Sequence, residues 1–329
     1  MSDNFKALMI NKTDDKQAIS IVNIDESELM EGNVVVDVTH STLNYKDGLA
    51  ITGSSPIVRT FPMIPGIDFS GIVRSSEDKK FSEGDRVVLN GYGLSENHFG
   101  GYSERARVNS NHLLKLPENI SNKQAMAIGT AGYTAMLCVL AIEDYGIKPE
   151  DGSILVSGAS GGVGSVAISL LSDLGYEVEA STGKIDEADY LKSLGAKSII
   201  DRTELSEPSK PLGKERWAGA IDSVGSQTLV NILAQTSYGG AVAACGLAQG
   251  MDLPSTVMPF ILRNVALLGV DSVMAPMNKR ERAWGRLSSD INIKKLEEMI
   301  VDTTIDQVET FAGEILKGKI KGRVVVNIS

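Results

Sequence analysis

The stretch that most constrains the fold is Ser153–Lys184, SILVSGASGGVGSVAISLLSDLGYEVEASTGK. The short apolar run Ile154–Val156 predicts a strand that is covered on both faces. Apolar residues recur at helical spacing after a glycine-rich turn: Val163, Val166, Ala167, Leu170, Leu171 and Leu174. Gly175 stands where a helix ends in a left-handed residue, and Tyr176–Ala180 predicts a second strand. The stretch therefore predicts a strand–turn–helix–strand unit.

The turn has the composition of a dinucleotide-binding fingerprint. Ala159–Gly164 matches the pattern G-x-G-x-x-G, with alanine in place of the first glycine. Glycines let the backbone turn sharply and approach a pyrophosphate, and the start of the helix offers unpaired N–H groups at the positive end of its dipole. Because a strand precedes the turn and a helix follows it, we interpret it as a dinucleotide site rather than a merely structural turn.

The end of the second strand indicates which dinucleotide is bound. Folds that bind NAD usually place Asp or Glu there, to hold the ribose 2′-OH. Here the segment is Ser181–Lys184, and the first acidic residue after it is Asp186. Hydroxyls and Lys184 suit a 2′-phosphate, and Arg202, just past Ile199–Ile200, can supply a second cation. We predict NADP(H); the alternative is that these are solvated surface charges.

Composition limits the partners and the location. The chain of 329 residues is long enough for two domains with a large core. Its net charge of −10 and pI near 5.0 argue against nucleic acid or an anionic membrane as the main partner. We find no signal peptide and expect no stretch long enough to span a bilayer, which indicates a cytoplasmic protein. Cys138 and Cys245 lie in apolar surroundings and are expected as buried thiols rather than a disulfide.

Two kinds of pattern divide the chain. In residues 1–122, short β-rich runs broken by glycine and proline predict a compact, irregular barrel. In residues 123–295, strands alternate with helices and predict a doubly wound parallel sheet. Beyond residue 290 we expect two helical segments and a final strand: Lys294–Ile300, Ile305–Leu316 and Arg323–Ile328. The strand would return to the first domain, so that residues 296–329 belong with residues 1–122.

Runs along nearly the whole chain resemble the medium-chain dehydrogenase/reductase superfamily. Besides the fingerprint, these runs are PGIDFSG (65–71), GDRV (84–87), GGYSE (100–104) and GTAGYTA (129–135). More specific runs resemble its acrylyl-CoA reductase group, also described as YhdH/YhfP-type quinone oxidoreductases. They are LNYKD (43–47), FPMIPGIDF (61–69), SENH (95–98), AACGLA (243–248), MPFILRNV (258–265) and GVDSV (269–273).

The resemblance implies a fold, a cofactor and a reaction. It implies a GroES-like β-barrel catalytic domain split around a Rossmann domain, NADPH as cofactor, a homodimer, and reduction of acryloyl-CoA to propanoyl-CoA. By correspondence of motifs it implies these NADPH contacts: Tyr45, Ser160, Gly161, Gly162, Val163, Thr182, Gly183, Lys184, Arg202, Leu247, Ile261 and Ser272. Lys184 replaces an arginine expected from the family, which keeps the charge but loses the bidentate fork.

The sequence also predicts that no metal is bound. Zinc alcohol dehydrogenases of the superfamily have Gly-His-Glu where this chain has Gly66–Asp68, and Ile67 cannot ligate zinc. Their structural zinc needs four closely spaced cysteines, and this chain has two. The three histidines, His40, His98 and His112, match no recognised ligand spacing. A chain without zinc favours reduction of an activated C=C bond over oxidation of an alcohol.

In an unsaturated thioester the carbonyl already activates the β-carbon, so the protein must align the hydride donor and stabilise negative charge on the thioester oxygen. The catalytic candidates are Asn44, Tyr45 and Asp47. The Tyr45 hydroxyl can donate a hydrogen bond or a proton to the enolate, and Asn44 offers an amide donor. Alternatively, Tyr45 packs on the nicotinamide or in the core, Asp47 bonds within its domain, and water supplies the proton. His98 is a further candidate donor, and Arg59 a candidate contact for a CoA phosphate.

Three functions remain open from the sequence. The leading hypothesis is an NADPH-dependent acryloyl-CoA reductase. The second is an NADPH-dependent quinone or small enone reductase, since a cleft open to a thioester also admits flat conjugated carbonyls. The third is a non-catalytic NADPH-binding protein, because some superfamily members serve as lens crystallins and others bind RNA. The acidic charge weakens the RNA option, and Tyr45 with the fingerprint favours catalysis.

Overall fold

The structure is a computed structural model that describes residues 4–14 and 16–328. Contacts between Cα atoms divide the chain into two units. Unit 1 is built from Met1–Thr130, Val273–Trp284 and Leu296–Ser329, and unit 2 from Ala131–Ser272 and Gly285–Lys295. The sequence patterns placed the first change of domain after residue 122, eight residues before this division, and assigned residues 273–284 to the other domain.

Unit 1 contains, within the described residues, a seven-stranded sheet of order β14-β15-β3-β4-β5-β7, with β6 also paired to β3. The strands are β3 (Val34–Leu43), β4 (Asp68–Ser76), β5 (Arg86–Asn90), β6 (Arg105–Val108), β7 (Leu114–Lys115), β14 (Ile300–Thr304) and β15 (Arg323–Asn327). The pairs are antiparallel except β14 with β15. A separate hairpin is formed by β1 (Phe5–Thr13) and β2 (Lys16–Ile24).

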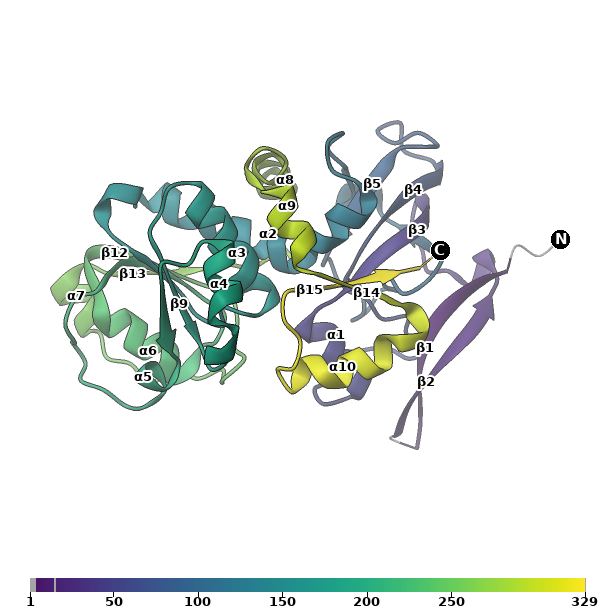
Figure 1. Ribbon diagram of the computed structural model, residues 1–329. Coiled ribbons are helices and arrows are strands. Elements are labelled where there is room, and N and C mark those ends of the chain that lie inside the picture. Colours follow the sequence, from purple (N-terminus) through teal and green to yellow (C-terminus); the bar gives the residue numbers. More distant parts are fainter. Residues whose placement is uncertain (1–3, 15, 329) are drawn as a thin grey trace. The chain divides into compact units, whose positions relative to one another are not determined.

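The C-terminal strand completes the sheet of unit 1. β15 pairs antiparallel with β3, with Val324 opposite Leu43 (Figure 1). This confirms the prediction that the chain returns to its first domain. The predicted helix over Lys294–Ile300 is wrong at its end, because α9 covers only Ile293–Glu298 and Ile300 begins β14. The next predicted helix starts as a 3-10 turn before α10 (Val308–Leu316).

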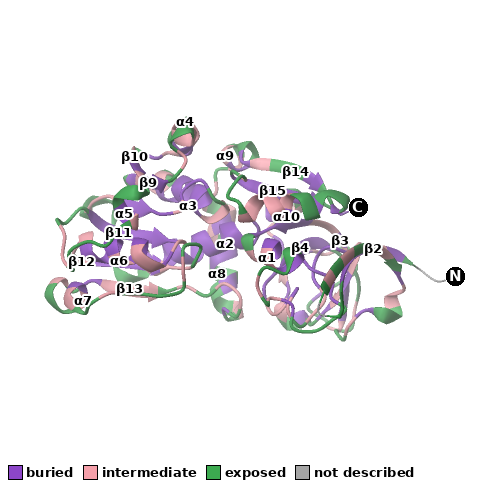
Figure 2. Cartoon of the chain, turned by 90° about the horizontal axis from the view of Figure 1, so that it is seen from below, coloured by how far each residue is buried: buried purple, intermediate pink, exposed green. Residues whose placement is uncertain are grey.

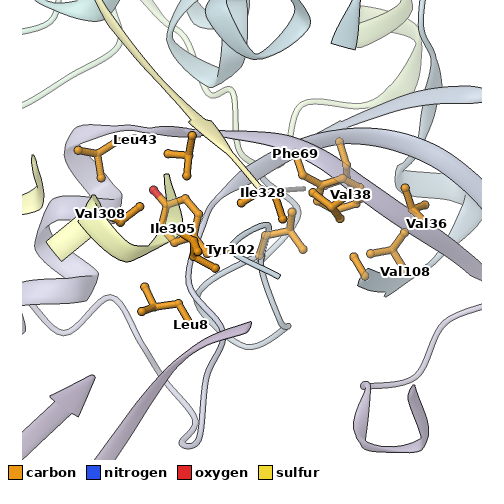
Figure 3. Close-up of a cluster of buried hydrophobic side chains, with 14 of the residues drawn as sticks. Leu8, Val36, Val38, Leu43, Phe69, Tyr102, Val108, Ile305, Val308 and Ile328 are labelled. Atoms are coloured by element: carbon orange, nitrogen blue, oxygen red, sulfur yellow. The ribbon is translucent and has the colours of Figure 1, made fainter. Parts of the chain in front are cut away.

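The core of unit 1 is a cluster of aliphatic and aromatic side chains between the sheet and α10. Figure 3 shows part of it: Leu8 from β1, Val36, Val38 and Leu43 from β3, Phe69 from β4, Val108 from β6, Val308 from α10, and Tyr102, Ile305 and Ile328 beside them. Along β3, the buried Val36 and Val38 alternate with the half-buried Asp37 and Thr39, whereas three consecutive residues are buried at each end of the strand. The core therefore fixes β3. The predicted catalytic residues, which begin at Asn44, directly follow the end of this strand.

Among the described residues, five α-helices belong wholly or partly to unit 1. They are α1 (Tyr45–Thr52), α2 (Asn122–Tyr145), α8 (Met277–Asp290), α9 and α10. In α2, Gly129 has φ of 51° and interrupts the helical backbone. A Cβ on Gly129 would lie 2.5 Å from Arg323 Nη2, so only glycine fits this bend.

The expectation that no stretch is long enough to span a bilayer is wrong for α2. Its 24 residues pass the test of length and hydropathy for a membrane span. However, 94% of its apolar window is buried inside the protein, as in the core helix of a globular fold. Length and composition are thus weak evidence for a membrane span here.

Unit 2 contains a parallel sheet of order β10-β9-β8-β11-β12-β13. Its strands are β8 (Ile154–Val156), β9 (Val178–Thr182), β10 (Ser198–Asp201), β11 (Trp217–Asp222), β12 (Thr236–Ala244) and β13 (Ala266–Gly269). Numbered along the chain, this is the order 3-2-1-4-5-6 of a doubly wound dinucleotide-binding fold. The predicted fold class of this half is confirmed.

Helices cover both faces of the parallel sheet (Figure 1). α3 (Gly162–Asp173) and α4 (Ala188–Leu194) pack together, as do α5 (Thr203–Ser206) and α6 (Ser226–Gln235), and α7 (Met258–Arg263) contacts β12. Figure 2 shows the central strands of unit 2 as buried, and every residue of β8 and β11 is buried. This burial explains the continuous apolar runs in the sequence.

Candidate functional site

The turn between β8 and α3 is tightened by Gly158. This residue has φ of 59°, in the left-handed region, and a Cβ on it would lie 2.5 Å from Ser223 Oγ. The sequence pattern assigned the first fingerprint position to Ala159. Ala159 is fully buried, and its N–H donates to the Ser181 carbonyl over 3.1 Å. Alanine is compatible with the turn because the left-handed position is filled by Gly158.

The turn leads directly into α3, whose N-cap is Gly161. A Cβ on Gly164 would lie 2.4 Å from the Gly158 carbonyl oxygen, so the helix packs tightly against the turn. The N–H groups of Gly162 and Val163 are in the first helical turn, where no intrahelical acceptor exists. With the positive end of the helix dipole, these donors can bind a phosphate, so the turn fits a dinucleotide.

The predicted 2′-phosphate residues meet at the carboxyl ends of β9 and β10. Arg202 N donates to the Thr182 carbonyl over 2.9 Å, which brings the residue after β10 beside the end of β9. A Cβ on Gly183 would lie 2.4 Å from Arg202 Nε, so the arginine side chain lies against this glycine. Thr182 Oγ1 accepts from Lys184 N over 3.1 Å and lies 3.4 Å from Ser160 Oγ. The structure therefore groups hydroxyls and cations, as the sequence predicted.

Lys184 has an acidic partner that the sequence analysis did not consider. Its Nζ donates to Glu187 Oε1 over 3.3 Å. Glu187 Oε2 is buried and has no hydrogen-bond partner among the described residues. The first acidic residue after β9 is Asp186, but it is Glu187, one residue further, that turns back to Lys184. Three-residue spacing across the short turn Ile185–Glu187 is the signal that could have revealed this pair.

A buried carboxyl group joins the loops after β8 and β11. Ser157 Oγ donates to Asp222 Oδ1 over 2.5 Å, and Gly225 N donates to Asp222 Oδ2 over 2.8 Å. Burial raises the pKa of Asp222 from its ordinary value, although hydrogen bonds from Ser157 and from two backbone N–H groups lower it. β8 and β11 are the strands at which the strand order reverses, where such sheets bind their ligands. Asp222 therefore fixes the loops at that point.

The remaining predicted cofactor residues of unit 2 lie in two places. Leu247 follows β12 and Ser272 follows β13, so both belong to the same carboxyl edge of the sheet as the fingerprint turn. Ile261 lies instead on α7, which contacts β12. The side chains of Leu247 and Ile261 are exposed. Apolar side chains exposed at a ligand edge are available to contact a bound group.

The two cysteines, distant in the sequence, meet in unit 2. Both are free thiols; Cys138 on α2 is buried, and Cys245 after β12 is half-buried. A hydrogen bond with Cys245, together with burial, raises the pKa of Cys138 well above its ordinary value. The prediction of buried thiols holds fully for Cys138 and partly for Cys245.

The predicted catalytic residues lie at the start of α1 in unit 1. Asn44 is the N-cap and Tyr45 the first helical residue, with 43% of Tyr45 exposed. Asp47 is fully buried and accepts hydrogen bonds from Asn44 N over 2.8 Å and from Ile67 N over 2.9 Å. Burial, reinforced by the negative charge of Asp68, raises the pKa of Asp47 to about 7. Asp47 therefore makes the hydrogen bonds within its domain that the sequence analysis gave as an alternative.

Behind α1 lies a buried polar network that the sequence analysis missed. Asp68 accepts hydrogen bonds from Thr42 Oγ1 over 3.0 Å, from Asn44 Nδ2 over 3.1 Å and from Thr130 N over 2.6 Å. Arg323 Nη2 donates to Asn44 Oδ1 over 3.3 Å and Nε to the Ala127 carbonyl. Because the amide of Asn44 is engaged on both sides, its role in the structure is to hold the start of α1.

His98, a further candidate donor, is hydrogen-bonded within its own unit. Its ring nitrogens lie 3.1 Å from the Phe99 and Glu31 carbonyl oxygens. Both partners are acceptors, so the ring holds two loops together. This arrangement favours the structural role that the sequence analysis had weighed against proton donation.

Within residues 4–14 and 16–328, no three His, Cys, Asp or Glu side chains are grouped closely enough to hold a metal ion. At Gly66–Asp68, Ile67 stands where the zinc enzymes have histidine, and its side chain has no atom that can ligate zinc. Its backbone N–H donates a hydrogen bond to Asp47. The absence of zinc stays a prediction, to be tested on the purified protein.

Two family models match separate parts of the chain. Residues 30–118 match the family described as alcohol dehydrogenase GroES-like domain, and residues 162–289 match the zinc-binding dehydrogenase family. The chain is 52% identical to "Probable acrylyl-CoA reductase AcuI" of Escherichia coli, over 98% of this chain and 100% of the relative. It is 49% identical to acrylyl-CoA reductase AcuI of Ruegeria pomeroyi, over 99% of each chain.

A solved structure agrees at the level of the fold. The YhdH oxidoreductase of Salmonella enterica, crystallised with NADP, has 53% sequence identity and a TM-score of 0.97, over 98% of this chain and 100% of that one. The predicted class, a Rossmann sheet inserted in a GroES-like domain, is confirmed. With the dinucleotide turn, the parallel sheet and full-length relatives in agreement, the chain belongs to the medium-chain dehydrogenase/reductase superfamily and, within it, to the acrylyl-CoA reductase family of oxidoreductases.

Proposed function

We propose that this chain is an NADPH-dependent reductase of the C=C bond of an α,β-unsaturated acyl thioester, with acryloyl-CoA as substrate and propanoyl-CoA as product. The observation that carries the proposal is the glycine turn at the start of α3 with Lys184 and Arg202 beside it. The names of two relatives, about half identical over their full length, support the substrate. The NADP in the Salmonella structure supports the cofactor.

The residues of unit 2 would hold the cofactor. The tight turn at Gly158 and the N–H groups at the start of α3 would bind the pyrophosphate. Thr182, Lys184 and Arg202 would bind the 2′-phosphate, because they present a hydroxyl and two cations at one edge of the sheet. When bound, NADPH supplies the hydride that adds to the β-carbon of the substrate.

The residues of unit 1 would act on the thioester. Negative charge that develops on the thioester oxygen needs a donor, and the half-exposed Tyr45 hydroxyl is suited to donate a hydrogen bond to it. Asn44 and Asp47 are engaged in the hydrogen bonds of α1, so they would position Tyr45 rather than contact the substrate. The proton that reaches the α-carbon would come from Tyr45 or from water.

A substrate panel tests the reaction. Purified protein is assayed by NADPH absorbance with acryloyl-CoA, a small enone and a set of quinones. We expect the highest kcat/KM with acryloyl-CoA. A higher value with a quinone would replace this function by that of a quinone reductase, and tight NADPH binding without turnover on any acceptor would favour a binding protein.

Replacing Tyr45 by phenylalanine tests the donor directly. Tyr45→Phe should lower kcat with acryloyl-CoA by about tenfold or more, the size of one hydrogen bond to a charged group. Tyr238→Phe, on an exposed tyrosine of unit 2, is the matched control and should leave kcat unchanged. An unchanged kcat in Tyr45→Phe would remove the hydroxyl from the mechanism.

We also propose a homodimer that forms along the free edge of β13. This strand is the last in its sheet, and the adjoining helix α7 exposes Ile261 and Leu262, by 71% and 55%. Unpaired strand edges with apolar neighbours are sites of pairing between chains. Sedimentation of the purified protein should give a dimer, and Leu262→Glu should convert it to a monomer; a monomeric wild type would refute the assembly. The cytoplasmic location stays a prediction.

A further inference from the structure

Three segments of unit 1 meet around Glu96. Lys46, in the first turn of α1, forms an ion pair with Glu96 Oε1. From the loop that precedes Pro62, Arg59 N donates to the Glu96 carbonyl over 2.8 Å, and Arg59 Nε lies 3.9 Å from Glu96 Oε2. One side chain therefore ties α1 to two loops. We refer to Lys46, Arg59, Phe61 and Glu96 as the basic cluster.

The charges in the basic cluster do not balance. One carboxylate faces two cations, and its side chain is only 19% exposed, whereas 70% of the Arg59 side chain is exposed. At 3.9 Å and with this exposure, the Arg59–Glu96 ion pair leaves the guanidinium available to other anions. The cluster therefore presents a positive charge on a protein whose net charge is −10.

An exposed aromatic ring, Phe61, follows Arg59 closely in the sequence and lies near a third cation, Lys12. Phe61 is two residues from Arg59 and is 38% exposed. Lys12 Nζ lies 5.9 Å from the centroid of its ring. A flat ring next to cations is the combination that stacks a nucleobase while binding its phosphates.

The basic cluster is adjacent to the proposed hydrogen-bond donor. Lys46 directly follows Tyr45, and both belong to the first turn of α1. From there the ion pair to Glu96 continues to Arg59, and Phe61 follows Arg59 by two residues in the sequence. All of these residues belong to unit 1, so their arrangement is independent of how the two units are placed.

We propose that the basic cluster binds the adenosine 3′-phosphate diphosphate portion of the CoA thioester, with Arg59 and Lys46 on the phosphates and Phe61 stacked on the adenine. Glu96 is the positioning residue that orients both cations. The inference rests on the proposed function, since a CoA thioester is the substrate class that the function requires. It assigns the recognition of the nucleotide to residues distinct from those that bind NADPH.

A pair of substrates that differ only in the nucleotide tests this proposal. Acryloyl-CoA is compared with acryloyl-pantetheine, a shorter thioester that has the same pantetheine arm but neither phosphates nor adenine. In Arg59→Ala and Phe61→Ala, KM for acryloyl-CoA should rise by about tenfold, the size of one charge-assisted hydrogen bond or one stacked base. KM and kcat for the short thioester should stay within about twofold of the wild type, because this substrate has no phosphate or adenine for Arg59 and Phe61 to contact.

Lys79→Ala is the matched control, since Lys79 is an exposed cation of the same unit outside the basic cluster. It should change neither KM. An equal loss with both thioesters in Arg59→Ala, or no loss with either, would overturn the proposal. Glu96→Gln should raise KM for acryloyl-CoA alone; a matching loss with the short thioester would show that Glu96 acts only on the fold.

Binding of CoA itself separates this inference from the proposed function. Titration calorimetry with CoA is performed on the protein saturated with NADPH, so that the dinucleotide site is filled. Weaker binding of CoA by Arg59→Ala than by Lys79→Ala supports the basic cluster even if the wild type reduces neither thioester, which would refute only the reaction. No binding of CoA, or equal binding by the two variants, would refute the basic cluster, whatever the turnover.

Discussion

The ion pair between Lys184 and Glu187 changes how available the lysine is to a phosphate. The lysine at the end of β9 predicts a phosphate site, but in the structure its ammonium group is bonded to Glu187. Arg202, by contrast, lies against Gly183 in a position where only glycine leaves room. If NADPH binds at this edge as we propose, we expect its phosphate to meet two cations of unequal availability.

The double variant Lys184→Ala, Arg202→Ala tests the 2′-phosphate site. KM for NADPH should rise by about a hundredfold, as expected for the loss of two charge-assisted hydrogen bonds. KM for NADH, which lacks the phosphate, should change little. Steady-state kinetics with both cofactors measures this difference, and equal effects on NADPH and NADH would contradict the assignment.

Glu187→Gln is the companion variant for the same measurement. Removing its charge releases Lys184 from the ion pair and takes a negative group away from the phosphate. KM for NADPH should therefore fall by about two- to fivefold, the range of a partly exposed ion pair, without a change for NADH. A rise in KM for NADPH would show that Glu187 orients Lys184 instead.

At the scale of elements, α1 is held by a carboxyl group that responds to pH. The folded protein raises the pKa of Asp47 to about 7, from 3.8 for the free side chain. Between these values the folded state binds more protons than the unfolded state, so the free energy of unfolding falls as pH rises from about 4 to about 7. Below that range, and above it, this group adds no pH dependence.

Asp47→Asn should remove this dependence. Urea unfolding of both proteins from pH 5 to pH 8 is the measurement, and the slope rather than the absolute stability is compared. The wild-type free energy should fall toward pH 7 relative to the variant, with a limit of about 1.4 kcal/mol per pH unit. Asp222, whose pKa is also raised, is present in both proteins and cancels. Identical slopes would mean that Asp47 is ionised throughout.

The elements that sequence reasoning predicted are those with strong local signals. β8, α3 and β9 follow from an apolar run, a glycine turn and a helical stripe, and Gly175 has the predicted left-handed backbone, with φ of 90°. The sequence did not predict α8, because this segment is largely polar. Its buried residues do recur at helical spacing: Arg280, Ala283, Trp284 and Leu287. The sequence did not predict β14 either, because its partner strand, β15, lies more than 20 residues away in the sequence.

The candidate site divides in the same way. The dinucleotide turn and the cations after β9 were predictable because they are local to one strand–turn–helix unit. The Asp68 network was not, because Thr42, Asn44, Asp68 and Arg323 come together only through the pairing of β3 with β4 and β15. The positive φ of Gly158, the residue before the fingerprint, could not be predicted because a motif gives the spacing of its glycines but not the backbone angles beside it.

At the scale of the whole molecule, the chain should work without a metal. In the part of the chain that the structure describes, no group of three potential ligands exists, and an activated thioester needs no Lewis acid. Dialysis against a chelator should therefore leave both the activity with acryloyl-CoA and the free energy of unfolding unchanged. An activity that is lost on dialysis and restored by zinc would contradict this prediction.

The pairing of β15 with β3 has a consequence for synthesis on the ribosome. The hydrogen-bonding edge of β3 that receives residues 324–327 stays open until the end of the chain emerges, whereas all strands of the parallel sheet are made earlier. We therefore expect nascent chains to have a folded unit 2 and an incompletely folded unit 1. The unpaired strand edge of unit 1 would be prone to aggregation and would need protection by chaperones. A chain that stops after Gly322 should remain in this condition, and pulse proteolysis should digest its N-terminal segment while sparing residues 131–272.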